Sequence, residues 1–147
     1  MQERREYRLN QVAGRVKIDF RSDEPIYLQI ARQIEELVGN GGLNIGDQLP
    51  TVREMATELS INFNTVARAY RLLDEARLIS TQRGRGTYIW EKPTEETLLI
   101  LKEEVLANLL QNLIVNVEKL GFTVNEAVDV LERMQIKNIS DENLEKK

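Results

Sequence analysis

The sequence contains neither cysteine nor histidine. Without these residues the chain has no disulfide, no thiol nucleophile, no imidazole acid or base, and none of the usual zinc ligands. An enzyme would then need paired carboxylates in a cleft, and the adjacent pair Glu103 and Glu104 diverges on any helix. We therefore expect no enzymatic activity, no catalytic residue, no metal site and no cofactor.

Long apolar runs are also missing. No stretch is apolar enough to span a bilayer, and the opening segment MQERREYRLNQ lacks the apolar core of a signal peptide. We expect a cytoplasmic protein without a membrane partner. A length of 147 residues suits one compact domain with an appendage.

The chain has no general excess of positive charge, because its formal net charge is -4. The charges are nevertheless unevenly distributed. Residues 49–88 carry six Lys and Arg against four Asp and Glu, whereas residues from 91 onward carry seven against twelve. Positive potential confined to one stretch is expected where a single face of a protein meets nucleic acid.

That stretch begins with two short predicted helices. Thr51 and Glu54 match a T-x-x-E capping box, and Asn62 is a good N-cap for a second helix after only Ser60 and Ile61. Apolar residues recur at helical spacing in both: Val52, Met55, Ala56 and Leu59 in the first, and Val66, Ala69, Tyr70 and Leu73 in the second. Two helices joined by so short a turn indicate a helix-turn-helix motif.

The outer side of the second helix has the chemistry that reads DNA. Asn pairs with adenine, Arg pairs with guanine, and Thr contacts a base edge or a phosphate. Asn64, Thr65 and Arg68 lie in the first two turns, which enter the major groove, and Arg71 lies closer to the phosphate backbone. Ordinary solvated side chains remain the alternative for this face alone.

A predicted hairpin follows directly. Residues 78–82 and 87–90 favour strands, and Arg83-Gly84-Arg85-Gly86 between them supplies turn glycines and two cations. Such a tip suits a phosphate or minor-groove contact. Taken alone it would equally fit a flexible solvated hairpin, but its place after a helix-turn-helix favours DNA contact.

Three blocks of this region, LPTVREMA, NTVARAY and RGRGTYI, resemble the signature of the winged-helix domain of GntR-type bacterial transcription regulators. The segment PIYLQIARQI and the short chain resemble the small YtrA-like branch, and the likeness spans roughly residues 18–89. By position, the resemblance and the wing charge imply these DNA contacts: Arg53, Asn62, Asn64, Thr65, Arg68, Arg83, Gly84 and Arg85.

Two positions depart from the family pattern. Phe63 stands where the branch usually has proline, which the first turn of a helix does not require. Arg77 stands where a glycine normally ends the recognition helix. The helix must therefore end differently or accept backbone strain at Arg77.

The segments before the motif complete a winged helix-turn-helix domain over residues 16–92. Residues 1–15 read as a polar arm, which is either partly helical and able to touch DNA or simply a frayed terminus. Val16, Ile18 and Phe20 alternate with charged residues, as in a half-buried strand that pairs with the wing hairpin. A helix then runs from Pro25 to the glycine cluster at residues 39–42.

Residues 93–139 read as two helices that form a hairpin. One apolar seam on the first helix consists of Leu99, Leu106, Leu110, Leu113, Val117 and Leu120, and a second of Leu98, Leu101, Val105 and Leu109. Thr123 and Glu126 match another capping box that starts the second helix. We expect the first seam to be a dimer interface, the alternative being that both seams pack on the winged helix. Residues 140–147 read as a disordered tail.

Together these features predict a mainly α fold with a small β wing and a C-terminal helical dimerisation hairpin. The expected function is that of a sequence-specific transcriptional regulator, a homodimeric repressor that binds a palindromic operator in double-stranded DNA. A protein-protein interaction module on a winged-helix scaffold is the alternative. A small-molecule effector bound at the dimer interface stays open.

Overall fold

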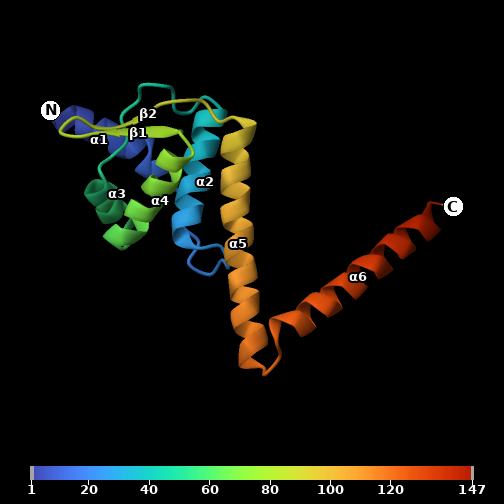
Figure 1. Cartoon of the computed structure of the whole chain (residues 1–147). Helices are drawn as coiled ribbons and strands as arrows, with labels where there is room; N and C mark the ends of the chain where they lie inside the picture. The colour runs from blue at the N-terminus through green and yellow to red at the C-terminus, as the bar shows by residue number, and fades with distance from the viewer. Residues whose placement is uncertain (1, 147) are drawn as a thin grey trace. The chain divides into compact units, whose positions relative to one another are not determined.

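The computed structural model describes residues 2–146. The elements in chain order are α1 (Gln2–Gln11), η1 (Ala13–Arg15), α2 (Ile26–Gly39), α3 (Val52–Leu59), α4 (Phe63–Glu75), β1 (Ile79–Gln82), β2 (Gly86–Ile89), α5 (Glu95–Lys119) and α6 (Val124–Glu145) (Figure 1). The chain divides into one unit up to Leu106 and another from Ala107. The mainly helical architecture with a two-stranded wing is the predicted one.

Both predicted caps of the helix-turn-helix are present. The Glu54 amide donates to Thr51 Oγ1 at 3.1 Å, and the Thr51 amide donates to Glu54 Oε2 at 3.0 Å. At the start of α4, the Asn64 amide donates to Asn62 Oδ1 at 2.7 Å. These bonds satisfy amides that have no partner within their helix, so both helix starts are fixed by side chains.

The end of α4 shows whether the helix ends in an unusual way at Arg77 or accepts backbone strain there. The Leu78 amide donates to the Leu73 carbonyl and the Arg77 amide to the Asp74 carbonyl, both at 3.0 Å, which is the Schellman arrangement. Arg77 has a φ of 60°, in the left-handed region that favours glycine. The helix therefore ends in the usual way and an arginine accepts the strain.

We predict that Arg77→Gly stabilises the protein by about 1 kcal/mol, because relief of left-handed strain outweighs the added entropy of the unfolded chain. Urea unfolding of both proteins measures the difference. Arg77→Ala is the matched control, since it removes the same charged side chain and keeps the strained φ. Equal stabilisation by alanine and glycine would show that the side chain, and not the backbone, is responsible.

The core lies between α2, α3, α4 and the wing. Its fully buried members include Ile30, Ile34, Met55, Val66 and Leu73. Met55, Val66 and Leu73 belong to the stripes predicted from helical spacing, and burial of each such side chain contributes about 1.5–3 kcal/mol. The core therefore fixes α4 against α2 and α3.

The wing is an antiparallel hairpin extended by a third segment. Ile79 pairs with Ile89 and Gln82 with Gly86 across β1 and β2. On the other side of β2, the Leu49 amide donates to the Thr87 carbonyl and Gln48 forms an isolated bridge with Tyr88. The loop that leads into α3 is therefore held against the wing.

The strand predicted around Val16, Ile18 and Phe20 is wrong, because these residues form no strand pairing. The backbone of Lys17 and of Asp19 instead bonds to glutamine side chains of α2. Gln33 accepts from the Lys17 amide and donates to its carbonyl, both at 2.8 Å, and Gln29 does the same for Asp19 at 2.8 and 2.9 Å. Side-chain amides thus take the place of a neighbouring strand.

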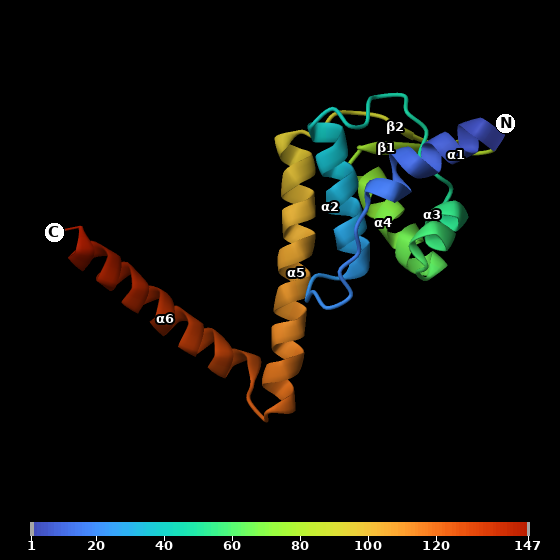
Figure 2. The ribbon, with the colours of Figure 1, turned by 180° about the vertical axis from the view of Figure 1, so that it is seen from behind.

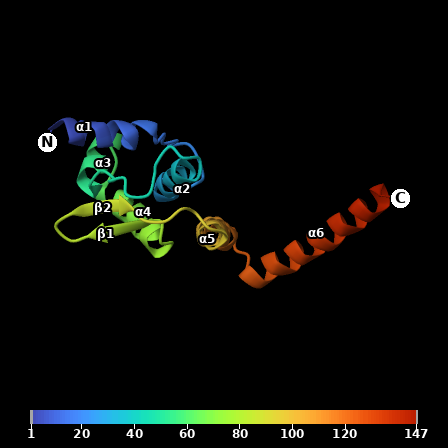
Figure 3. The same ribbon diagram turned by 90° about the horizontal axis from the view of Figure 1, so that it is seen from above.

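The segment described as a polar arm is largely helical. α1 lies along α3 (Figure 3), and Val12 and Ala13 just after it are buried in the core. Arg8 donates from Nη1 to Gln48 Oε1 at 2.8 Å. The beginning of the chain, apart from Met1, which lies outside the described residues, therefore packs on the winged helix.

The first part of α5 belongs to the same unit and lies beside α2 (Figures 1 and 2). Leu101 is buried, Ile100 and Val105 pack against the core, and Thr97 Oγ1 donates to the Ala76 carbonyl at 3.3 Å. Part of the second predicted seam thus packs on the winged helix. The first seam remains largely exposed: Leu99, Leu106, Leu110, Leu113 and Leu120 each expose more than two fifths of their surface.

Residues from 107 onward contain the rest of α5, a turn at Gly121 and α6. The Thr123–Glu126 capping box is present, with the Glu126 amide donating to Thr123 Oγ1 at 3.2 Å. α6 continues to Glu145, where the sequence predicted disorder from Ser140, and Lys147 lies outside the described residues. Both predicted C-terminal helices are present, and α6 has no buried residue. None of the described helices combines the length and the hydropathy that a bilayer crossing needs.

Candidate nucleic-acid interface

The helix-turn-helix presents an exposed polar surface at α3 and the start of α4. Arg53 is exposed in the first turn of α3, and Asn62 and Asn64 are exposed at the start of α4, with Thr65 partly exposed. The side-chain oxygen of Asn62 is engaged by the Asn64 amide, so this residue caps the helix. Asn64 and Thr65 are therefore the polar side chains of the first helical turn that face outward.

Arg68 contacts residues of two other helices. Its Cζ is 3.9 Å from the centroid of the Tyr27 ring on α2, and its Nη2 is 3.8 Å from Glu104 Oε1 on α5. A cation over an aromatic ring contributes about 0.5–1 kcal/mol at an exposed site, and an exposed ion pair about 0.2–1 kcal/mol. The structure thus places Arg68 among side chains of the protein.

The wing tip is a tight turn that carries two exposed arginines. The Arg85 amide donates to the Gln82 carbonyl at 2.9 Å, and Gly84 has a φ of 76°, which suits the third position of a type II turn. Arg83 and Arg85 are exposed on either side of this glycine. Figures 1 and 3 show the tip and α3 on the same side of the unit, so one DNA surface could contact both.

Several bonds hold the wing in place. The Arg85 carbonyl accepts from the Tyr88 hydroxyl at 2.8 Å and from Gln48 Nε2 at 3.3 Å. Gly86 has a φ of 114°, a backbone conformation that favours glycine, and a Cβ there would require the Gln48 side-chain amide to shift. The wing arginines are therefore presented by a fixed loop.

A buried tyrosine joins the recognition helix to the loop that precedes α3. The Tyr70 hydroxyl donates to the Pro50 carbonyl at 2.7 Å. Burial, and to a lesser degree the nearby Glu54 carboxylate, raises the pKa of Tyr70 far above its ordinary value. The hydroxyl therefore stays protonated and remains a donor under all ordinary conditions.

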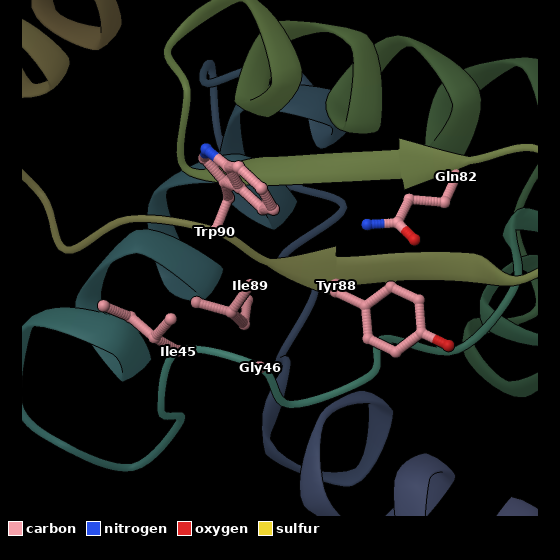
Figure 4. Close-up of a pocket in the computed structure, with 6 residues that line it drawn as sticks. All are labelled: Ile45, Gly46, Gln82, Tyr88, Ile89 and Trp90. Carbon is pink, nitrogen blue, oxygen red and sulfur yellow. The ribbon is translucent and has the colours of Figure 1, made fainter.

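An open pocket of about 410 Å³ lies beside the wing (Figure 4). Ile45, Ile89 and Trp90 form its apolar part, and Gln82 and Tyr88 add the polar groups. None of the described residues that line it is charged. Within residues 2–146, no group of three or more acidic, cysteine or histidine residues could hold a metal ion.

Comparison with known proteins matches this geometry. The family described as "Bacterial regulatory proteins, gntR family" matches residues 26–89. The HTH-type transcriptional repressor YtrA of Bacillus subtilis is 43% identical over 106 residues, which are 72% of this chain and 81% of that protein. The chain belongs to the GntR family.

Solved structures of similar proteins agree with the fold. YtrA from Sulfolobus acidocaldarius is 39% identical with a TM-score of 0.52, covering 63% of this chain and 98% of that one. A transcriptional antiterminator from Listeria monocytogenes EGD-e is 28% identical with a TM-score of 0.53, covering 81% of this chain and 88% of that one. This GntR protein is a YtrA-like DNA-binding transcriptional regulator, and the comparisons favour that function over a protein-protein module.

Sequence reasoning missed the residues that hold the interface in shape. The sequence indicates no partner for Arg8, Gln48 or Tyr27, and it brings in Glu104 only as half of an adjacent carboxylate pair. Nothing in their local spacing connects them, because Arg8 and Gln48 are 40 residues apart, and Tyr27 and Glu104 are 77 residues apart. The one available signal was the Tyr27 hydroxyl, because Tyr27 recurs with Ile30 and Ile34 at helical spacing and a buried hydroxyl needs a partner.

Proposed function

We propose that this GntR protein is a homodimeric repressor that binds a palindromic operator. The observation that carries the proposal is that α3 and the wing tip lie on the same side of the unit (Figures 1 and 3), with Arg53 exposed on α3 and Arg83 and Arg85 exposed at the tip. Exposed cations on elements next to a helix that enters the major groove suit contacts to the phosphate backbones. Operator DNA also implies a cytoplasmic location.

The proposed contacts divide by chemistry. Asn64 and Thr65 read base edges from the first turn of α4, and Asn62 keeps that turn capped. Arg53 contacts phosphate beside the groove, and Arg83 and Arg85 contact phosphate or the minor groove, with Gly84 allowing close approach.

Dimerisation is proposed from the exposed apolar residues of the two C-terminal helices. The first seam of α5 is exposed, and α6 presents Val128, Leu131 and Met134 with no buried residue along its length. Helices in proteins are stabilised mainly by packing of an apolar face, and extended exposed patches mark interaction sites. A second copy supplies the same faces and a second recognition helix, and an effector site at that interface would be formed with it.

Selection of bound fragments from the source genome tests the proposal. Footprinting of the selected fragments should reveal two symmetric half-sites whose centres are about one helical turn, or a multiple of it, apart. A transcription assay with the selected promoter should then show lower output when the protein is added. Protection of a single asymmetric site, or no selected sequence, would contradict a dimer on a palindrome.

We predict that Arg83→Ala and Arg85→Ala each weaken binding to all sequences by a similar factor. Each loss should also reduce the slope of log affinity against log salt by about 1, because one phosphate contact is removed. Titrations at several salt concentrations measure both effects. Lys92→Ala, which removes one exposed cation outside the hairpin, is the control. Loss restricted to particular bases would indicate that the wing reads sequence.

A further inference from the structure

Three helices of the first unit meet at one carboxylate. The Tyr27 hydroxyl of α2 donates to Glu104 Oε1 of α5 at 2.8 Å. Arg68 Nη2 of α4 lies 3.8 Å from the same oxygen, while its Cζ lies 3.9 Å from the Tyr27 ring centroid. The recognition helix is thereby joined to both helices behind it.

This arrangement is incompatible with a simultaneous base contact by Arg68. A bidentate contact to guanine uses the free edge of the guanidinium and requires the side chain to extend from the helix into the groove. Here the guanidinium lies over the Tyr27 ring, and Tyr27 is only 4% exposed. Arg68 would have to leave both the ring and the Glu104 carboxylate to reach a base pair.

We infer that Arg68 is a positioning residue, through which Glu104 and Tyr27 set the pose of α4 in the DNA groove. The inference rests on the proposed DNA-binding function and assigns a role at that same site. α5 carries Glu104 and, two residues later, Leu106 of the exposed seam. The helix proposed for dimerisation therefore also holds the recognition helix.

A DNA-contacting Arg68 and a positioning Arg68 predict opposite effects of changing Glu104. If Arg68 bound DNA, Glu104 would compete with the DNA for its charge, and a lysine at 104 would release it and strengthen binding. If Arg68 positions α4, a lysine at 104 repels the guanidinium and removes the acceptor of the Tyr27 hydroxyl. Binding then weakens, even though the protein has become more positive.

The experiment compares operator affinity of the full chain at one fixed salt concentration. Glu104→Lys should weaken binding by about tenfold, a size typical for coupling between side chains in contact. Glu103→Lys is the matched control: it makes the same charge change at the adjacent exposed position and should leave affinity equal or slightly higher. Melting temperatures of all variants establish that each remains folded.

The double variant Arg68→Ala with Glu104→Lys completes the test. It should bind no more weakly than Arg68→Ala alone, because the effect of Glu104 passes through Arg68. Arg68→Ala should also lower affinity by the same factor for every base substitution and leave the salt slope unchanged. A phosphate contact would reduce that slope, and a base contact would confine the loss to one position per half-site.

Tighter or unchanged binding by Glu104→Lys overturns the inference, as does additive loss in the double variant. Either result would leave the proposed function intact if the unaltered protein binds its selected operator. Absence of operator binding by the unaltered protein would instead refute the proposed function. The two failures are therefore distinguishable in the same titrations.

Discussion

Replacing Leu110 and Leu113 together by aspartate should convert the proposed dimer into monomers that bind the operator at least about a hundredfold more weakly. Both leucines are exposed on the first seam of α5. Two aspartates there would place buried, unpaired charges in the proposed interface, which is strongly unfavourable. A monomer loses the second half-site contact that linkage makes nearly intramolecular.

Sedimentation of the double variant measures its oligomeric state, and operator titration measures its affinity. Gln111→Asp with Asn112→Asp is the matched control, since it introduces two aspartates at exposed positions roughly 130° around the helix from the seam. The control should remain dimeric and bind the operator. If the leucine variant sediments as a dimer, the interface lies on another surface.

Removing the Asn64 side chain should have the second large effect. Asn64→Ala is expected to cost about 1–3 kcal/mol with the preferred operator and to relax the choice of base at one position in each half-site. The cap of α4 should survive, because Asn62 accepts from the backbone amide of residue 64. The loss can then be assigned to base contact and not to fraying of the helix.

A panel of operators with single base substitutions, titrated at one salt concentration, tests this expectation. The affected positions should be symmetric about the operator centre, because a dimer presents α4 twice. Arg71→Ala is the control: Arg71 is exposed two turns further along α4, where the backbone is nearer than the bases. Uniform loss across the panel for Asn64→Ala would move base reading to Thr65.

Local patterns predicted the helix-turn-helix and wing well. The side chains of Thr51, Glu54 and Asn62 form hydrogen bonds with backbone amides only two or three residues away. Their caps could therefore be inferred from spacing alone. The strained Arg77 could be anticipated for the same reason, since the Schellman turn involves only neighbouring residues. The predicted core stripes follow from helical periodicity and are found at the core of the structure.

Long-range partners could not be predicted. The residue type of Arg68 and its position on the helix suit base reading. Only the fold reveals that Arg68 lies over the Tyr27 ring and beside Glu104. The alternation of Val16 and Ile18 with charged residues correctly indicates an extended, half-buried segment. Periodicity does not reveal whether a neighbouring strand or a side chain of a helix forms the hydrogen bonds of that segment's backbone. The roles of the DNA-facing residues remain predictions, for which the experiments above are designed.

The glutamine pair on α2 matches the residue spacing of a helix to the residue spacing of an extended segment. Gln29 and Gln33 are four residues apart on a helix, a rise of about 6 Å, while Lys17 and Asp19 are two residues apart in extended chain, about 6.6 Å. The two intervals nearly coincide over this distance, so both amide groups meet a backbone partner. A one-residue deletion in the turn between this extended segment and α2 would leave the two spacings matched. It would, however, turn Val16 and Ile18 from the core towards water. The length of that turn is consequently fixed by the packing of the segment before it.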